Sequence, residues 1–308
     1  MTLPAGYELR PTTPGDLDAV AGVFLADDGG DPGRVVIDAD FLRDEWSRAG
    51  FSLASDAWVV AGPDGVVVGY MQTMREEPNV ECWGAVHPGH RGRGIGSALF
   101  DWAEQRASEL VAGLPLPRVR FVSDVGDRGA EALLQSRDLC LVHHFWHMQI
   151  DLVGPLHPGP APQGFEISEV DPVVDLPAVH AVLGEALADH WDSRSEPFDR
   201  WVDEHVNVTR FDPTLWLLAT QGRQPVAALT GHIQGDRGWV GGLGVRAPWR
   251  GRGRGLGEAL LRRSFAAFSR HGLRRVVLGV DAENPTGATA LHEHVGMRVV
   301  QRWDVWER

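Results

Sequence analysis

Hydrophobic and polar positions follow the same order of patterns twice along the chain. Each half opens with apolar residues at helical spacing and continues with two runs in which apolar and polar residues alternate. In the first half these segments are residues 16–26, 57–61 and 66–74, and in the second half they are residues 171–188, 215–220 and 225–233. Pro63-Asp64-Gly65 and Gln221-Gly222-Arg223 separate the alternating runs, so each half is predicted to contain a helix followed by a β-hairpin.

The later patterns of the two halves also correspond. A third strand is predicted to end at Val86 in the first half and at Val245 in the second, and a glycine-rich stretch and a helix follow each valine. Further strands are predicted at residues 118–123 and 275–281, and last strands at residues 141–151 and 298–306. Each half is therefore predicted to be α+β, with a mixed sheet flanked by helices and closed by its own last strand.

The repeat unit is a whole domain. The two valines lie 159 positions apart, which is about half of the 308 residues, and this length suits two domains. Residues 154–164 contain four prolines and three glycines, which cannot hold a helix or a central strand. The predicted organisation is an N-terminal domain at 1–153, a linker at 154–164 and a C-terminal domain at 165–308.

Composition narrows the class of protein. A net charge of −13 disfavours a nucleic-acid partner, and no apolar run is long enough to cross a membrane. All 29 basic residues are arginine, so a P-loop, which needs lysine, is excluded. The two cysteines, Cys82 and Cys140, lack metal-ligand spacing, so we expect no metal and a reducing, cytoplasmic location.

An Arg-x-x-Gly-x-Gly hexamer occurs between strand and helix in both halves. Glycines let backbone N–H groups approach a ligand, and the following helix N-terminus favours an anion such as a pyrophosphate. Arginines add charge-assisted hydrogen bonds. A dinucleotide fold is the competing interpretation, but its motif follows the first strand of a βαβ unit, whereas these loops follow a hairpin. We therefore predict a phosphate-bearing cofactor.

The chain resembles the GNAT superfamily of acetyl-CoA-dependent N-acetyltransferases. The similarity rests on a strand ending in Val-x-x-x-x-Arg-Gly, the glycine loop, a helix, a strand, and then Asn284 before a helix that ends in Gly296-Met297. The whole chain resembles a tandem arrangement of two such domains, as in the mycothiol synthase branch. The resemblance implies two GNAT folds, each with a splayed central strand, and acetyl-CoA or another short acyl-CoA as cofactor.

The resemblance also implies the cofactor-binding residues. In the C-terminal domain, a bulged strand ending at Leu243, Gly244 and Val245 would pair with the pantetheine arm. The loop amides would hold the pyrophosphate, in the segment Arg250, Gly251, Arg252, Gly253, Arg254, Gly255, Leu256 and Gly257. Asn284 would contact the pantetheine or order the next helix. The corresponding residues of the N-terminal domain are Val86, Arg91, Gly92, Arg93, Gly94, Ile95, Gly96 and Ser97. The second loop is longer than usual. Its register from Val245 favours Arg250–Gly255, and its register from the helix favours Arg252–Gly257.

Two departures concern the chemistry. Where many family members carry a tyrosine as general acid, this chain has His292, whose side chain can either protonate a thiolate or merely pack. Where some members carry a glutamate base, the chain has Trp239 and, in the first half, Val80. Both departures argue against a mechanism like that of mycothiol synthase. The N-terminal domain has Leu134 at the tyrosine place, so we expect no acetyl transfer there, but either cofactor binding or a structural role.

Acceptor residues are expected after the first helix of the second domain. His190 and Trp191 stand between acidic residues there, which suits an amine, and a solvated loop is the alternative. His232 is either a base or a core histidine. The sequence thus predicts an enzyme that transfers an acetyl group from coenzyme A to a primary amine of a small molecule in the C-terminal domain. A non-catalytic acyl-CoA sensor or scaffold is the alternative, and a monomer is plausible.

Overall fold

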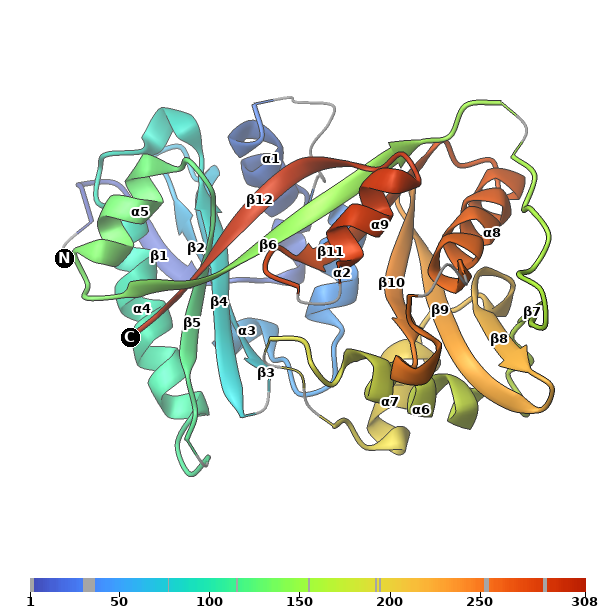
Figure 1. Ribbon diagram of the computed structural model, residues 1–308. Coiled ribbons are helices and arrows are strands. Elements are labelled where there is room, and N and C mark those ends of the chain that lie inside the picture. Colours follow the sequence, from blue (N-terminus) through green and yellow to red (C-terminus); the bar gives the residue numbers. More distant parts are fainter. Residues whose placement is uncertain are drawn as a thin grey trace. The chain divides into compact units, whose positions relative to one another are not determined.

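A computed structural model describes residues 3–29, 37–76, 78–114, 116–154, 156–191, 193, 195–251, 255–284 and 287–308 (Figure 1). The chain forms two compact units. The N-terminal unit comprises Met1–Phe145 and Gln301–Arg308, and the C-terminal unit comprises Trp146–Val300. Among the described residues, no helix is long and apolar enough to cross a membrane.

The N-terminal unit is an α+β fold with helices on both faces of its sheet. Its elements are β1 (Glu8–Pro11), η1 (Pro14–Asp16), α1 (Leu17–Asp27), α2 (Ala39–Trp46), α3 (Leu53–Asp56), β2 (Ala57–Ala61), β3 (Val67–Glu76), β4 (Asn79–Val86), η2 (Pro88–His90), α4 (Ile95–Leu110), β5 (Val119–Asp124) and α5 (Arg128–Gln135). The strand order is β1-β2-β3-β4-β5-β12, where β12 is Arg298–Glu307. The predicted hairpin is confirmed, because β2 pairs antiparallel with β3.

Neighbouring residues of β3 show how its two faces are covered. Tyr70 is fully buried in a core that includes residues of α1 and α2. A side chain at Gly69 would meet Ile95 and Leu99 of α4, on the other face. Alternation along the strand therefore sends successive positions to different helix layers, and the sheet lies between α1 and α2 on one side and α4 on the other.

The C-terminal unit repeats this plan. Its elements are β6 (Cys140–Asp151), β7 (Glu166–Glu169), α6 (Leu176–Leu187), α7 (Phe198–His205), η3 (Pro213–Leu215), β8 (Leu217–Gln221), β9 (Gln224–Gln234), β10 (Arg237–Val245), η4 (Ala247–Trp249), α8 (Leu256–Arg270), β11 (Arg275–Asp281) and α9 (Ala288–His294). The strand order is β6-β11-β10-β9-β8-β7. A Cβ at Gly238 would meet Phe268 of α8, and one at Gly244 would meet Ala186 of α6, so α8 and α6 cover opposite faces.

The last strand of each half completes the sheet of the other unit. Residues Trp303–Glu307 of β12 pair antiparallel with Arg120–Asp124 of β5, and β6 stands next to β11 (Figure 1). The predicted domains at 1–153 and 165–308 each kept their own last strand, so the observed units differ from them. The positions of both strands along the chain were predicted to within a few residues; their partners lie far away in the sequence and leave no local signal.

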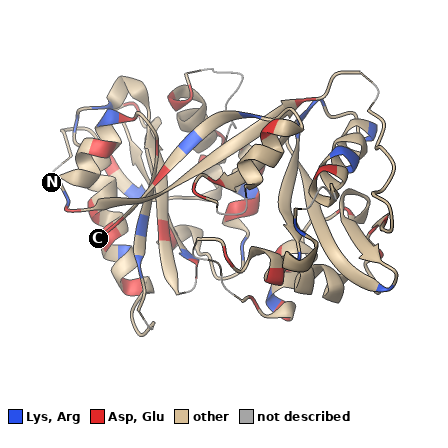
Figure 2. Ribbon diagram, viewed as in Figure 1, with Lys and Arg blue, Asp and Glu red and all other residues tan. Residues whose placement is uncertain are grey.

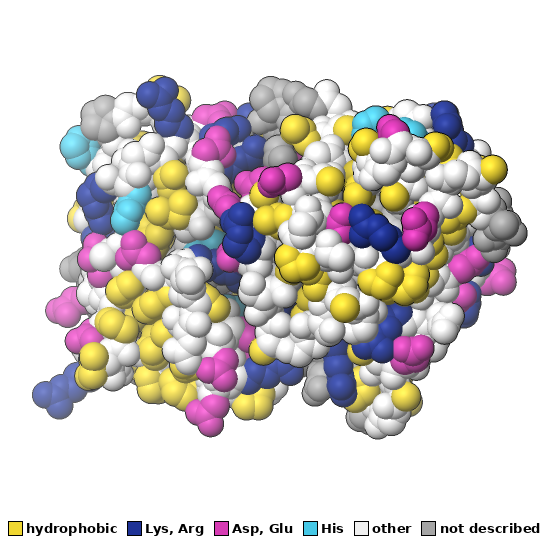
Figure 3. All heavy atoms as spheres, turned by 180° about the vertical axis from the view of Figure 1, so that it is seen from behind, with side chains coloured by type: hydrophobic (Ala, Val, Ile, Leu, Met, Phe, Trp, Pro, Cys, Tyr) yellow, Lys and Arg dark blue, Asp and Glu magenta, His cyan; other side chains and the backbone are white. Residues whose placement is uncertain are grey.

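Charged residues are spread over both units. Figure 2 shows acidic and basic positions interspersed on the helices, and Figure 3 shows acidic, basic and apolar side chains mixed over the face seen from behind. The net charge of −13 therefore belongs to a mixed surface.

Candidate functional site

The central strands of the C-terminal unit separate as predicted. β10 and β11 run parallel and pair only where Gly238–Val240 face Val276–Leu278. Both strands continue beyond this point, to Val245 and Asp281, without further pairs between their described residues. On its other side β10 stays paired with β9, with a register shift between Val240 and Gly242. The bulge turns β10 away from β11 and leaves one edge of its last residues open.

Two glycines stand where the strands separate, and sequence reasoning did not single them out. Gly241 follows the last paired residue of β10, and Gly279 follows the last paired residue of β11. Both are exposed although they lie in the middle of their strands. A glycine inside a run of apolar strand residues marks a bulge or a close approach, and this was the available signal.

The glycine loop leads from the open strand edge into α8. Gly255, the N-cap residue of α8, has φ +65°, and Gly251 has φ +63°. A Cβ at either position would meet no heavy atom within 4 Å among the described residues. The predicted residues Arg252, Gly253 and Arg254 lie outside the described part of the chain. Backbone amides at the start of a 15-residue helix, with no described side chain over Gly251 or Gly255, fit a pyrophosphate group.

Arg250 fixes the start of this loop. Its Nε donates to the carbonyl oxygen of Val245 at 2.7 Å, and its Nη2 donates to the carbonyl oxygen of Ala186 at the end of α6. Arg91 makes the equivalent bond in the N-terminal unit, from Nε to the carbonyl oxygen of Val86 at 3.3 Å. The side chain of Arg250 therefore holds the strand end to α6, a positioning role in addition to the predicted contact with phosphate.

The two halves can be compared at both ends of the second loop. Arg250 matches Arg91 through this shared bond, and Gly255 matches Gly94, because both are left-handed N-caps of the following helix. Each of the two alternative registers therefore agrees with the N-terminal unit at one end of the loop, and the cofactor residues that they name stay a prediction. The additional residues lie between Gly251 and Gly255.

Other predicted cofactor residues have packing roles that the structure makes visible. Gly244 is buried, and a Cβ there would lie 2.7 Å from Ala186, so glycine allows α6 to approach β10. A Cβ at Gly257 would lie 2.8 Å from Leu291, so glycine brings α8 and α9 together. Leu256 is buried in the core, and Leu243 is half-buried against it. These residues shape the site through the backbone.

Asn284 and His190 meet, although they were predicted from separate features. Nδ2 of Asn284 lies 3.1 Å from Nε2 of His190. Because the amide nitrogen only donates, Nε2 accepts this bond and the neutral ring carries its proton on Nδ1. Burial lowers the pKa of His190, and Arg250 lowers it further, against the opposing effect of Asp281. The pair ties the segment after α6 to the segment after β11. Trp191, the residue after His190, is half-buried.

The two other candidate histidines differ in their surroundings. His292 of α9 is 5% exposed, and its Nδ1 has no hydrogen-bond partner among the described residues. Burial lowers the pKa of His292 to about 4, so its ring is neutral near pH 7. His232 of β9 is half-buried with its ring 6.3 Å from that of Trp239, and burial lowers its pKa to about 3.

The matching loop of the N-terminal unit is lined by acids. Gly92 and Gly94 have φ +73° and +82°, and a Cβ at Gly92 would meet no described heavy atom within 4 Å. Arg91, however, pairs with Asp27, and it also pairs with Asp127 at 3.1 Å. Asp127 follows β5 by three residues, as Asn284 follows β11, and it caps α5. A carboxylate therefore stands where the C-terminal unit has an amide.

The other predicted residues of the N-terminal loop contact protein groups of the same unit or are buried in it. Nη1 of Arg93 donates to the hydroxyl oxygen of Tyr7 at 2.7 Å. Ile95 is buried at the start of α4, and Gly96 and Ser97 are half-buried in its first turn. The arginines of this loop are thus bound by protein groups.

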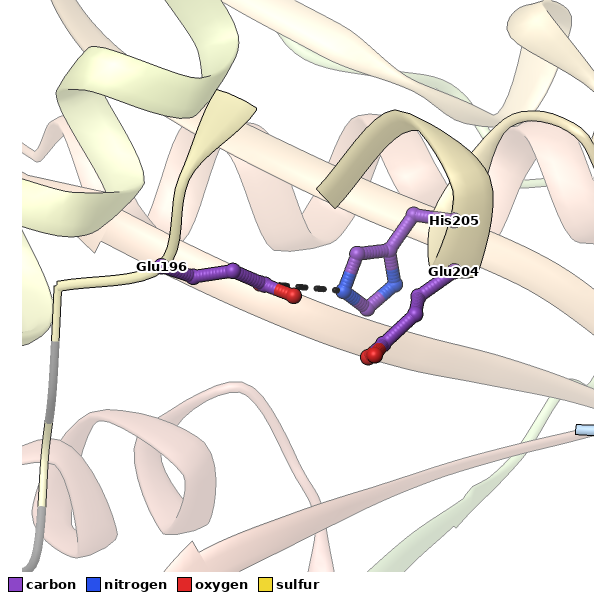
Figure 4. A group of neighbouring side chains, drawn as sticks. All are labelled: Glu196, Glu204 and His205. Carbon is purple, nitrogen blue, oxygen red and sulfur yellow. Dashed lines mark ion pairs between the residues drawn. The ribbon is translucent and has the colours of Figure 1, made fainter. Parts of the chain in front are cut away.

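The C-terminal unit also contains a group of side chains with metal-ligating chemistry. Glu196, Glu204 and His205 bring one ligand atom each to within 4.8 Å of one another (Figure 4). His205 pairs with Glu196 at 3.9 Å, and Arg200 pairs with Glu204 at 2.8 Å. Arg200 also lies 3.8 Å from Glu196, so one arginine pairs with both carboxylates and the group forms an ion-pair network.

Comparison with known proteins identifies the fold. Residues 182–297 match the Acetyltransferase (GNAT) family, and residues 54–128 match an Acetyltransferase (GNAT) domain. A GCN5-related N-acetyltransferase structure from Sphaerobacter thermophilus superposes with a TM-score of 0.87 and 30% identity, over 100% of this chain and 96% of that chain. A tandem GNAT protein from the clavulanic acid biosynthesis pathway, at 17% identity, has a TM-score of 0.72 over 98% of both chains.

Two similar proteins are named mycothiol acetyltransferases. The protein from Salinispora arenicola is 30% identical over 266 residues, which cover 79% of this chain and 78% of the relative. The protein from Thermobispora bispora is 29% identical over 97% of this chain and 96% of its own length. Both units thus define an acetyltransferase of the GCN5-related type. The chain belongs to the GNAT family and is a tandem member of it.

Proposed function

We propose that this acetyltransferase moves an acetyl or other short acyl group from coenzyme A to a primary amine of a small molecule, and that the C-terminal unit performs the reaction. The observation that carries the proposal is that an open edge of β10 leads into a glycine loop at the start of α8, where a Cβ at Gly251 or Gly255 would meet no described heavy atom within 4 Å. The N-terminal unit also has separated strands, because β4 and β5 pair only where Val80–Cys82 face Val119–Phe121. The difference lies at the loop, where Arg91 pairs with two aspartates, Asp27 and Asp127, whereas Arg250 pairs with one, Asp189, at 3.6 Å. The mycothiol acetyltransferase relatives support a small-molecule acceptor.

The residues of the C-terminal unit fit an acyl-CoA. Backbone amides around Gly251 and Gly255 would hold the pyrophosphate, and the unpaired edge of β10 at residues 241–245 would hydrogen-bond the pantetheine arm as an added strand does. When bound, the cofactor supplies the thioester, which is the activated acyl group. The N–H groups of the same strand edge would donate to the carbonyl oxygen of that thioester, and the protein would align it with the amine.

His292 as general acid stays a prediction. A pKa of about 4 and a buried ring mean that His292 carries no positive charge near pH 7, so only its N–H can donate. Within the described part of the chain, Nδ1 of His292 is buried and has no hydrogen-bond partner. If His292 assists the leaving thiolate, His292→Gln lowers kcat and leaves the Kd of acetyl-CoA unchanged; a packing role would lower the melting temperature instead.

The cofactor site is tested by calorimetric titration with acetyl-CoA of two matched variants. Gly255 and Gly272 stand at opposite ends of α8, both have positive φ, and a Cβ at either would meet no described heavy atom within 4 Å. Gly255→Ala should weaken acetyl-CoA binding at least tenfold, because the methyl group occupies the approach to the loop amides. Gly272→Ala carries a similar backbone strain but should keep full affinity. Equal affinities would contradict the site.

Turnover is measured as release of coenzyme A thiol. Wild-type protein should release thiol when both acetyl-CoA and a primary amine are present. It should not release thiol from acetyl-CoA when the amine is left out. Binding of acetyl-CoA without transfer to any amine would favour the alternative, an acyl-CoA sensor or scaffold.

A further inference from the structure

The end of α6 contacts the segments that follow both of the separated strands. Arg250, which follows β10, donates to the carbonyl oxygen of Ala186. Asn284, which follows β11, donates from Nδ2 to Nε2 of His190 at 3.1 Å. Residues 186–190, which we call the α6 end, are therefore bonded to both sides of the gap that opens between β10 and β11. The unpaired edge of β10 faces this gap, so a pantetheine arm added to that edge would lie between β10 and the segment that contains Asn284.

The turn after β11 fixes the backbone of Asn284. The carboxylate oxygen Oδ1 of Asp281 accepts from the backbone N–H of Glu283 at 2.8 Å, and the carbonyl oxygen of Asp281 accepts from the backbone N–H of Asn284 at 3.2 Å. Asp281 itself is buried, so the turn is anchored in the fold. These bonds leave the orientation of the Asn284 amide group open, because the last side-chain torsion of asparagine is broad. The bond to His190 orients this amide.

The direction of that bond decides which amide atom is available to a ligand. Nδ2 only donates and Oδ1 only accepts, and the two atoms lie at opposite corners of the amide group. While Nδ2 donates to His190, Oδ1 is directed away from that ring, and an acceptor there suits the amide N–H groups of a pantetheine arm. A protonated His190 reverses the arrangement, because its Nε2 then donates and the amide has to turn its oxygen towards the ring.

We infer that His190 is a positioning residue for the cofactor: by accepting from Nδ2 of Asn284, it keeps Oδ1 of that amide directed at an N–H group of the pantetheine arm. This inference rests on the proposed binding of acyl-CoA at the open edge of β10. It gives His190 a different task from the contact with the amine that the sequence suggested. His190 then raises the affinity for acyl-CoA through Asn284, because an acceptor that is already oriented loses less freedom when the ligand binds.

Calorimetric titration with acetyl-CoA tests the role of His190. His190→Phe keeps a ring at the α6 end and removes the acceptor, so the Kd should rise about three- to tenfold, the value of one neutral hydrogen bond. His190→Gln, whose Oε1 can accept from Nδ2, should recover most of the affinity. The control is His271→Phe at the far end of α8, where Nε2 lies 3.3 Å from the hydroxyl oxygen of Thr214. This variant loses a comparable contact and should leave the Kd unchanged.

A double-mutant cycle tests whether His190 acts through Asn284. Asn284→Ala should raise the Kd of acetyl-CoA at least as much as His190→Phe does. Adding His190→Phe to Asn284→Ala should then cost no further affinity, because the amide that His190 orients is gone. At saturating acetyl-CoA, the KM of methylamine should keep its wild-type value in all these variants. Both side chains are half-buried, and unchanged melting temperatures confirm that the variants are folded.

The pH dependence of acetyl-CoA affinity gives a second readout. Burial has the largest effect on the pKa of His190 and lowers it from the usual 6.5; Asp281 of β11 and Asp189 of the α6 end oppose this effect, and Arg250 adds to it. Below pH 6.5 the ring takes up a proton and can no longer accept from Nδ2. The affinity of the wild-type protein should therefore fall relative to that of His190→Gln. This comparison cancels the titration of the cofactor's own phosphate groups.

The outcomes separate this inference from the proposed function. Wild-type protein that does not bind acetyl-CoA would refute the proposed cofactor site. Binding that His190→Phe leaves unchanged, or additive losses in the double variant, would refute the positioning role of His190. A raised KM of methylamine with an unchanged Kd of acetyl-CoA would overturn it in favour of a direct contact between His190 and the amine.

Discussion

Trp306 of β12 should control the stability of the N-terminal unit, although it is the third residue from the end of the chain. Its side chain is 4% exposed in a core with Phe100 and Phe121. Its Nε1 donates to Oγ of Ser123 at 3.0 Å. Replacing a buried tryptophan by alanine costs about 3–5 kcal/mol, and the unpaired Ser123 hydroxyl adds about 1 kcal/mol. Such a loss is a large part of a typical domain stability of about 5–15 kcal/mol.

Hydrogen exchange followed by mass spectrometry locates the effect. In Trp306→Ala, amide protection should fall in β4, β5 and α4, and the urea midpoint of the N-terminal unit should drop. Arg308→Ala is the control, because Arg308 is an exposed side chain of the same strand end and its ion pair with Glu104 lies at the surface. Loss of protection in β9 and β10 in place of β4 and β5 would show that the last strand does not belong to the N-terminal unit.

Other measurements address the cofactor and pH. Titration with acetyl-CoA should give one site per chain, because Asp27 and Asp127 place negative charge at the N-terminal loop; two equal sites would contradict this. The double substitution Asp27→Asn with Asp127→Asn should create a weak second site. Since the pKa of His292 is about 4 in the fold and about 6.5 when unfolded, its contribution to stability is full above pH 6.5 and is lost as pH falls towards 4. The urea midpoint should therefore decline over that range, and less steeply in His292→Gln; parallel slopes would refute the assignment.

Much of the fold could be predicted because its signals are local. The ends of the third strands at Val86 and Val245 coincide with the ends of β4 and β10. Alternation, turn residues and glycine loops all act within a few residues, and the internal repeat allowed each half to support the other. The register of the loop needed the structure, since it depends on the bond from Arg250 to Val245.

The parts of the site that escaped sequence reasoning depend on long-range contacts. Asp127 gives no sign in the sequence that it pairs with Arg91, 36 residues earlier. The neighbourhood of Asn284 and His190, 94 residues apart, is likewise a consequence of how β11 and α6 pack. His292 stands where the resemblance places a general acid, but its burial is visible only in the three-dimensional structure.

The exchanged strands bear directly on the site. Residues 146–151 of β6 belong to the C-terminal unit, where β6 stands next to β11 and contributes His147 beside Gly279. These residues precede the Pro/Gly linker, so a fragment that starts after the linker lacks the strand that stands next to β11. It also carries β12 without its partner β5, and an unpaired strand exposes backbone groups that favour aggregation. The two halves of the sequence therefore depend on each other for folding, even though only one of them is proposed to carry out the transfer.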